Sequence, residues 1–288
     1  MKLSEIHTRD PFILTYKNKY YMYGTRGSES YSETATGLDV FVSNDLKNWE
    51  GPVEVFRREK DFWATRDFWA PEVHIYNDRF YMFVSVKSDT KHRGTQIFVS
   101  DKPDGRFKPI SEFPVTPEEW ECLDGTLYVE DNVPYIIFCH EWTQTGDGGV
   151  YYARLSRDLK KMVSKPHLMW KASDYSDVID ISTDKSIESK VTDGPFMYKN
   201  SKNELMCIWS TMNKKGYCEL VSKSDSGKIE GNWSVQQKPI FEKDGGHGMI
   251  FRNLDDELMF TMHCPNVPGK ERVKFMLLED RDGNLLLK

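Results

Sequence analysis

The stretch RDPFILTYKNKYYMYG at residues 9–24 consists of two apolar, aromatic-rich runs separated by the short polar turn KNK. Apolar residues alternate with a period of two in these runs, and a short turn between such runs predicts a β-hairpin. Similar stretches follow: APEVHIYNDRFYMFVS (70–85), LDGTLYVEDNVPYIIFCH (123–140), TDGPFMYKNSKNELMCIWS (192–210) and GGHGMIFRNLDDELMFTMH (245–263). Each copy begins with a small-residue turn that carries an acidic residue or a histidine. The chain therefore repeats one structural unit five times.

A further strand-like segment follows each hairpin, as in LDVFVSNDLKNW at residues 38–49. With Asp10, Glu72, Asp124, Asp193 and His247 as corresponding positions, the units are spaced by 62, 52, 69 and 54 residues. Three or four strands recurring about every 40–60 residues are typical of β-propellers, in which radial packing covers both faces of each sheet. We therefore predict an all-β, five-bladed β-propeller that forms a single domain over residues 1–288. A β-sandwich with fortuitously similar segments is the alternative.

The composition argues against several classes of protein. The 288 residues include 39 Lys and Arg against 45 Asp and Glu, a net charge of −6, which favours neither a nucleic-acid partner nor an anionic membrane. No stretch approaches the roughly 18 consecutive apolar residues of a transmembrane helix. The N-terminus lacks a signal-peptide pattern, so cytoplasmic location is the default expectation, although a secreted or periplasmic protein with its signal removed would look the same. The five cysteines are scattered without a CxxC pair, which predicts buried thiols.

Acidic residues lie at corresponding places in the repeats. The innermost strands of a propeller converge on its axis, so the residue that starts each inner strand points into one axial pocket. Asp10, Asp124, Asp193 and His247 are predicted to hold this position. Carboxylates that converge cannot all ionise easily, so at least one pKa should rise. A carboxylic acid with a raised pKa beside an ionised carboxylate is the pairing that glycoside hydrolysis uses. The alternative for each aspartate alone is an ordinary turn residue.

Short motifs on these repeats resemble glycoside hydrolase family 43. They are RDPF (9–12), WAPEV (69–73), LDGTLY (123–128), TDGP (192–195) and GGHG (245–248), and they span nearly the whole chain. Each motif is weak alone, but their order on successive repeats makes the pattern specific. The resemblance implies a five-bladed propeller that hydrolyses α-L-arabinofuranosides or β-D-xylosides of plant polysaccharide oligomers with inversion. It also implies that Asp10 is the general base, Asp124 the modulator of pKa and Asp193 the general acid.

Asp193 departs from the family pattern, in which the acid is usually a glutamate in an EGP sequence. Aspartate is one methylene shorter, which would set its proton back by about 1.5 Å on an unchanged backbone. Misplacement on that scale can cost about 100-fold in rate. Either the backbone compensates or another acid serves, and Glu188 and Glu121 are the nearest substitutes. The same departure keeps open a catalytically impaired, carbohydrate-binding propeller.

Residues beside the motifs are candidate substrate contacts. Trp69 could stack on a sugar face or pack between blades. Arg9 and Phe12 flank the base and could contact the substrate or only pack. His140 and Glu141 end a strand of the third repeat, where they could form hydrogen bonds with sugar hydroxyl groups.

The expected partner is an oligosaccharide, and the sequence does not predict the oligomeric state. The inserts at residues 24–37 and 173–190 could close one end of the pocket, which favours exo action on a short substrate. We expect no required cofactor. The family resemblance implies that His247 faces the axis near water or a single calcium or sodium ion.

Overall fold

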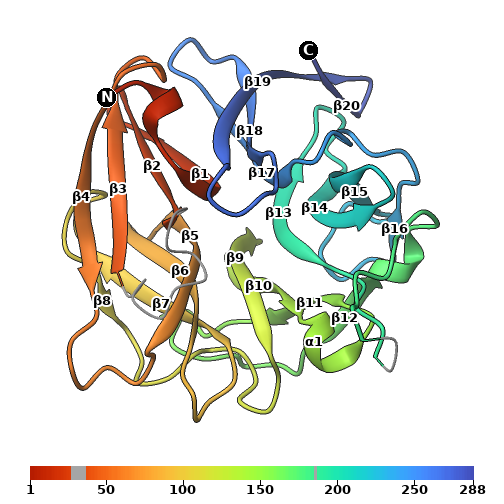
Figure 1. Cartoon of the computed structure of the whole chain (residues 1–288), viewed down its shortest axis with the longest axis horizontal. Coiled ribbons are helices and arrows are strands. Elements are labelled where there is room, and N and C mark those ends of the chain that lie inside the picture. Colours follow the sequence, from red (N-terminus) through yellow and green to blue (C-terminus); the bar gives the residue numbers. More distant parts are fainter. Residues whose placement is uncertain (27–36, 185–186) are drawn as a thin grey trace.

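The protein is a ring of five antiparallel sheets around a central axis (Figure 1). This computed structural model describes residues 1–26, 37–184 and 187–288, and each sheet in it contains four strands. The strands of a sheet are consecutive in the chain, so each sequence repeat builds one blade. The predicted all-β, five-bladed propeller is confirmed.

The strands and short helices have the following bounds. The first blade contains β1 (Thr8–Tyr16), β2 (Lys19–Arg26), β3 (Gly37–Ser43) and β4 (Trp49–Arg57), and the second contains β5 (Arg66–Tyr76), β6 (Arg79–Lys87), β7 (Gly94–Ser100) and β8 (Lys108–Pro109). The third contains β9 (Cys122–Glu130), β10 (Val133–His140), β11 (Gly149–Arg154) and β12 (His167–Lys171), and the fourth contains β13 (Asp193–Lys199), β14 (Leu205–Asn213), β15 (Gly216–Ser224) and β16 (Trp233–Val235). The fifth contains β17 (Gly246–Arg252), β18 (Leu258–Cys264), β19 (Arg272–Arg281) and β20 (Asn284–Leu287), and the short helices are η1 (Leu3–Glu5), α1 (Trp142–Thr145) and η3 (Ala172–Asp174).

The hydrophobic core lies between neighbouring blades. Apolar side chains alternate along the strands and meet those of the next sheet, which is how a radial array of sheets removes apolar surface from water. Phe56 of the first blade and Phe98 of the second have ring centroids 4.7 Å apart. Trp170 of the third blade and Trp209 of the fourth are 5.8 Å apart. The aromatic residues noted in the sequence thus hold the blades together.

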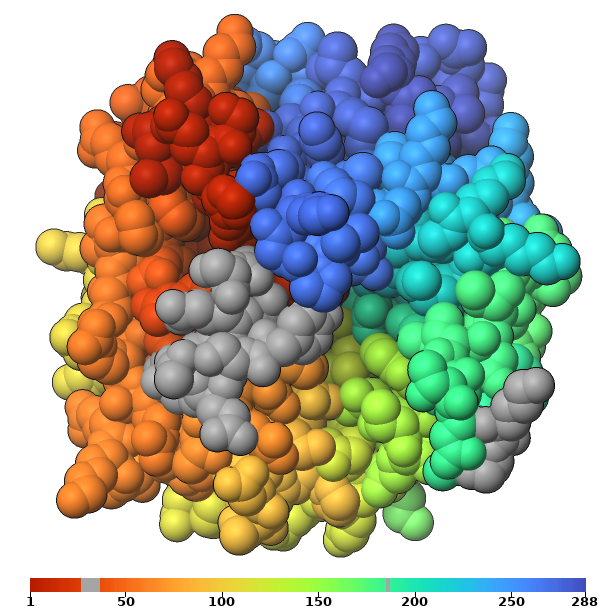
Figure 2. Space-filling view, viewed as in Figure 1, coloured from red at the N-terminus to blue at the C-terminus, as the bar shows by residue number. Residues whose placement is uncertain are grey.

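The first and fifth blades share no strand, because each consists only of strands from its own repeat. The ring is therefore closed by side-chain contacts between these two blades. The first and fifth blades are neighbours on the ring, and their surfaces meet directly (Figures 1 and 2). Thr15 Oγ1 donates to the carbonyl of Arg252 at 2.8 Å, and the amide of Leu254 donates to Tyr20 Oη at 2.7 Å. Arg9 adds an ion pair with Glu271 at 2.9 Å.

Every inner strand carries an irregularity where it approaches the axis. Asp10, Ala70, Asp124, Gly194 and His247 have φ values of 51, 46, 55, 51 and 53°. The pairing register between the first and second strands shifts at these residues. L-residues rarely adopt positive φ, and such strain in a strand concentrates at functional sites. The corresponding residue in the fourth blade is Gly194, so the register predicted for Asp193 was wrong by one residue. In the second blade the residue with positive φ is Ala70 rather than the predicted Glu72.

Two expectations from composition can be compared with the structure. Among the described residues, no helix is long and apolar enough to span a membrane. All five cysteines are free, and the prediction of buried thiols is confirmed for four of them, while Cys264 is partly exposed.

Candidate active site

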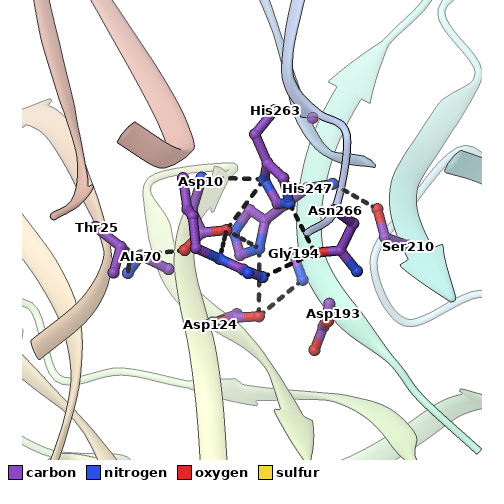
Figure 3. Close-up of polar contacts among 12 residues, drawn as sticks. Asp10, Thr25, Ala70, Asp124, Asp193, Gly194, Ser210, His247, His263 and Asn266 are labelled. Carbon is purple, nitrogen blue, oxygen red and sulfur yellow. Dashed lines mark hydrogen bonds and ion pairs between the residues drawn. The ribbon is translucent and has the colours of Figure 1, made fainter. Parts of the chain in front are cut away.

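A cavity of about 340 Å³ opens where the inner strands converge. The structure brings most of the predicted site residues to its wall, from all five blades: Arg9, Asp10, Trp69, Asp124, Glu141, Asp193 and His247. Figure 3 shows the three aspartates gathered around the His247 imidazole. The prediction that these carboxylates share one axial pocket is therefore confirmed by their positions.

Phe12 and His140 are not brought to this cavity. Phe12 is 5% exposed and packs edge-on against His74, with ring centroids 5.2 Å apart. His140 stacks on Trp120 with centroids 4.1 Å apart and bonds to Gln144 at 2.7 Å. For Phe12 the structure shows the packing alternative. His140 does not line the cavity either, because its ring is held by Trp120 and Gln144, neither of which belongs to the cavity wall.

Asp10 is surrounded by groups that favour its ionised form. Thr25 Oγ1 donates to Oδ2 at 2.6 Å, and His247 Nδ1 and Arg9 Nε lie 3.3 and 3.9 Å from Oδ1. Burial by itself would raise the pKa of Asp10, but the charges of His247 and Arg9 outweigh it and lower that pKa to about 2. Asp10 is therefore a carboxylate at every pH at which the protein is expected to work.

The surroundings of Asp124 and Asp193 favour the protonated form of the carboxyl group instead. Burial raises the pKa of Asp124, and the Asp10 carboxylate adds to this, although His247 acts against it. Burial also raises the pKa of Asp193, and the neighbouring Asp124 raises it further. The pair titrates as a unit, and Asp193 is the member that holds a proton more firmly. Tyr217 Oη donates to Asp193 Oδ2 at 2.9 Å and orients the carboxyl group.

His247 supplies positive charge on the axis. Burial would lower its pKa, but the carboxylates of Asp10, Asp124 and Asp193 together raise it to about 9, so the imidazole is protonated at neutral pH. Its backbone N–H donates to Ser210 Oγ at 2.7 Å, which fixes the strained backbone (Figure 3). No group of three or more His, Cys, Asp or Glu side chains with metal-binding geometry occurs in the part of the chain that the structure describes. The calcium or sodium ion stays a prediction.

The second strand of each blade supports the next inner strand, a feature that the sequence analysis missed. The amide of Asp10 donates to His263 Nδ1 at 3.2 Å, and the amide of Ala70 donates to Thr25 Oγ1 at 2.7 Å. The amide of Asp124 donates to Ser85 Oγ at 2.8 Å, and that of His247 donates to Ser210 Oγ at 2.7 Å. In the third blade the equivalent residue is Cys139, and the amide of Gly194 donates instead to Asp124 Oδ2 at 2.9 Å. This exchange ties the Asp124 carboxylate to the strand that carries Asp193. A sequence signal existed, because these polar residues end or nearly end each repeat.

The alternative acids do not reach the cavity. The Glu188 side chain is 61% exposed and pairs with Lys190 at 3.2 Å. Glu121 Oε1 is bound by Lys87 at 2.8 Å and His92 at 2.9 Å. Neither residue lines the cavity, whereas Asp193 does. Asp193 therefore remains the candidate acid.

A propeller whose axial cavity holds one ionised and one protonatable carboxyl group has the features of a carbohydrate-cleaving site. The sequence profile of "Glycosyl hydrolases family 43" matches residues 3–276. The chain belongs to this family, as the resemblance of its motifs indicated.

Solved structures and curated proteins show the same relationship. The structure of an endo-arabinase from Bacteroides thetaiotaomicron VPI-5482 superposes with a TM-score of 0.91 and 35% identity, covering 99% of this chain and 98% of that one. Alpha-L-arabinofuranosidase 43 of Humicola insolens is 22% identical over 251 residues, or 81% of this chain and 47% of that protein. Xylosidase/arabinosidase 43A of the same organism is 23% identical over 143 residues, or 44% of each chain. The matched regions thus span less than half of these two curated relatives.

Proposed function

We propose that this protein is an inverting glycoside hydrolase that cleaves α-L-arabinofuranosyl linkages in arabinan-type oligosaccharides. The observation that carries the proposal is the axial cavity that brings Asp10, Asp124 and Asp193 together, where neighbouring positive charges lower the pKa of Asp10 and burial raises the pKa of Asp193. The choice of sugar rests on the 35% identity with a solved structure described as an endo-arabinase. β-D-Xylosides are the second candidate substrate, since the name of a curated relative includes xylosidase activity.

In the proposed reaction Asp193 donates its proton to the glycosidic oxygen as the bond to the anomeric carbon breaks. Asp10 accepts a proton from a water molecule that attacks the opposite face of the sugar, so the anomeric configuration inverts. The water oxygen ends on the sugar, the leaving alcohol carries the Asp193 proton, and both carboxyl groups return to their starting states by proton exchange with solvent. Asp124 raises the pKa of Asp193 and, through the Gly194 amide, holds its strand in place.

The positive charges next to Asp10 have two effects in this mechanism. His247 and Arg9 keep the carboxylate ionised, so it is ready to accept a proton without a prior ionisation step. The same charges make it a weaker base, because a group with a low pKa binds a proton less strongly. Arg9 is itself fixed by Glu271 at 2.9 Å and by Asn266 at 3.1 Å, so its distance to Asp10 is set by the fifth blade.

Exo action is part of the proposal. The segment of residues 173–190 contributes Ile181 to the cavity wall, which supports closure on that side. The second insert predicted to close the pocket, residues 24–37, lies largely outside the described residues. Endo action is the competing mode, favoured by the description of the solved relative. Products separate the two, because exo action releases one small sugar from the earliest time points and endo action releases a ladder of oligosaccharides.

An activity panel tests the function. Linear arabinan, arabino-oligosaccharides and aryl α-L-arabinofuranosides and β-D-xylosides are incubated with the protein, and the first-formed anomer is identified by ¹H NMR. We expect arabinofuranoside cleavage with inversion, and product retaining the substrate configuration would contradict the mechanism. Binding of the oligosaccharides without any hydrolysis would identify the impaired, carbohydrate-binding propeller instead. We also propose that no cofactor is required, so activity after treatment with a chelator and in sodium-free buffer should be unchanged.

A further inference from the structure

Arg93, between β6 and β7, is a buried cation beside the cavity that the proposed reaction does not use. It is 6% exposed. Its Nη2 lies 3.0 Å from Asp67 Oδ2, and its Nη1 donates to Glu141 Oε2. Burial would lower the pKa of Arg93, but Glu141 and Asp67 raise it, so the guanidinium stays charged. An arginine in this position must be compensated by its partners, because an isolated buried charge is unfavourable.

The guanidinium also contacts an aromatic wall of the cavity. The Arg93 Cζ atom lies 4.3 Å from the centroid of the Trp69 ring, in the geometry of a cation–π contact. Trp69 and Glu141 both line the cavity, while Arg93 stands behind them. Asp67 and Trp69 belong to the inner strand of the second blade, and Glu141 immediately follows β10 of the third blade. One side chain therefore joins two neighbouring blades at the cavity wall.

The backbone on which Trp69 sits is unusually strained, which makes external support necessary. Asp67 and Ala70 on either side of Trp69 have φ values of 58 and 46°. The register between β5 and β6 shifts both before and after Trp69. Strained residues keep their conformation only when surrounding contacts hold them. The ion pair with Asp67 and the stacking on Trp69 provide two such contacts from the same guanidinium.

We propose that Arg93 is a positioning residue that fixes the Trp69 ring and the Glu141 carboxylate as the sugar-binding wall of the cavity. The inference rests on the proposed function for its sugar ligand. Arginine is required because a planar guanidinium can stack on an indole while its edge bonds to two carboxylates, which a lysine ammonium cannot do. Trp69 then presents an oriented apolar surface to a sugar ring. Because Trp69 would contact the bound sugar in both the ground state and the transition state, its misorientation affects binding more than the chemical step.

The test is the variant Arg93→Lys, which keeps the charge and removes the planar stack. With an arabino-oligosaccharide as substrate, we expect KM to rise about 3- to 30-fold, the range of a desolvated cation–π contact, with kcat changed less than twofold. The variant Arg79→Lys is the matched control, because Arg79 forms an exposed ion pair with Asp101 at 2.8 Å and does not line the cavity. Its KM should equal that of the wild type. A KM in Arg93→Lys equal to that of the control would overturn the proposal.

A double-mutant cycle shows whether Arg93 acts through Trp69. In a Trp69→Ala background, Arg93→Lys should raise KM by a smaller factor than in the wild type, because the ring that it orients is gone and only its contact with Glu141 is left to lose. Full additivity of the two effects would show that Arg93 acts by another route.

A readout that needs no turnover separates this inference from the proposed function. In protein labelled with 5-fluorotryptophan, the ¹⁹F resonance of Trp69 is assigned by its loss in Trp69→Phe. We expect that resonance to shift and broaden in Arg93→Lys and to stay unchanged in Arg79→Lys. If the wild type fails to cleave arabinofuranosides, the proposed substrate is wrong but this measurement still reports on Arg93. An unperturbed Trp69 resonance in Arg93→Lys refutes the positioning role.

Discussion

Replacing Asp193 with alanine tests the least typical residue of the site. A positioned general acid contributes about 10²- to 10⁴-fold to rate, which corresponds to about 2.7–5.4 kcal/mol of transition-state stabilisation. This contribution is needed when the leaving group is a sugar alcohol, which leaves poorly without a proton, and hardly needed when it is an activated nitrophenol. Asp193→Ala should therefore slow the cleavage of arabino-oligosaccharides by about 10²- to 10⁴-fold and that of a nitrophenyl glycoside by less than about tenfold.

The pH dependence gives a second measure of the same change. Burial and Asp124 raise the pKa of Asp193, so the acid is protonated below that pKa and loses its proton as pH rises through it. The wild-type kcat/KM should consequently fall on the basic side, and this limb should flatten in Asp193→Ala. The assay is a pH profile of kcat/KM on both substrates.

Glu188→Ala is the matched control, because Glu188 is exposed and paired with Lys190 outside the cavity. It should leave both rates and the basic limb unchanged. An equal loss on both substrates in Asp193→Ala would refute the assignment of Asp193 as proton donor. A leaving-group effect in Glu188→Ala would transfer that role to the segment before β13.

Three further outcomes are expected. Asp10→Asn should lower kcat by about 10²- to 10⁴-fold while calorimetry still detects oligosaccharide binding, and more than a tenth of the wild-type rate would show that Asp10 is not the base. Tyr217→Phe removes the hydrogen bond that lowers the pKa of Asp193, so the basic limb should move to higher pH by about 1–2 units, whereas a move to lower pH would contradict that role. Gly248→Ala would place a Cβ atom 2.2 Å from Cζ of the buried Phe260, so scanning calorimetry should show a lower Tm through a loss of about 1–3 kcal/mol, and an unchanged Tm would mean that the ring has room to move.

The repeat pattern predicted the blades and most of the site because both depend on local information. A period of two over short aromatic runs specifies strands whatever their neighbours are. Small-residue turns at the start of each repeat mark the strained residues, since positive φ is favoured by only a few residue types. Asp10, Asp124 and His247 therefore fall at their predicted positions. Asp193 does not, because the fourth blade places a glycine at the strained position and the acid one residue earlier.

The supporting residues could be seen in the sequence only after the register of each blade was known. Thr25, Ser85 and Ser210 lie near the ends of second strands, where their recurrence in the repeats does not by itself show which amide each hydroxyl group meets. Their function arises because each blade packs on the next and aims the hydroxyl at an amide in a neighbouring repeat. The supporting residues recur with the repeats, but the bond itself joins two repeats and forms only when their blades pack together.

The sequence by itself determined the number of blades, the hairpin and following strand of each repeat, and the approach of Asp10, Asp124 and His247 to one axis, because hydrophobic period and turn chemistry act over a few residues. Only the tertiary structure decided which carboxyl group holds a proton, since that depends on burial and on charges that come from different blades. It also decided that Arg93 stands behind Trp69, a contact across 24 residues of chain that the packing of two sheets brings to 4.3 Å. Local patterns specify where a residue lies on its strand, whereas the distance between strands of different repeats is set by the packing of whole blades.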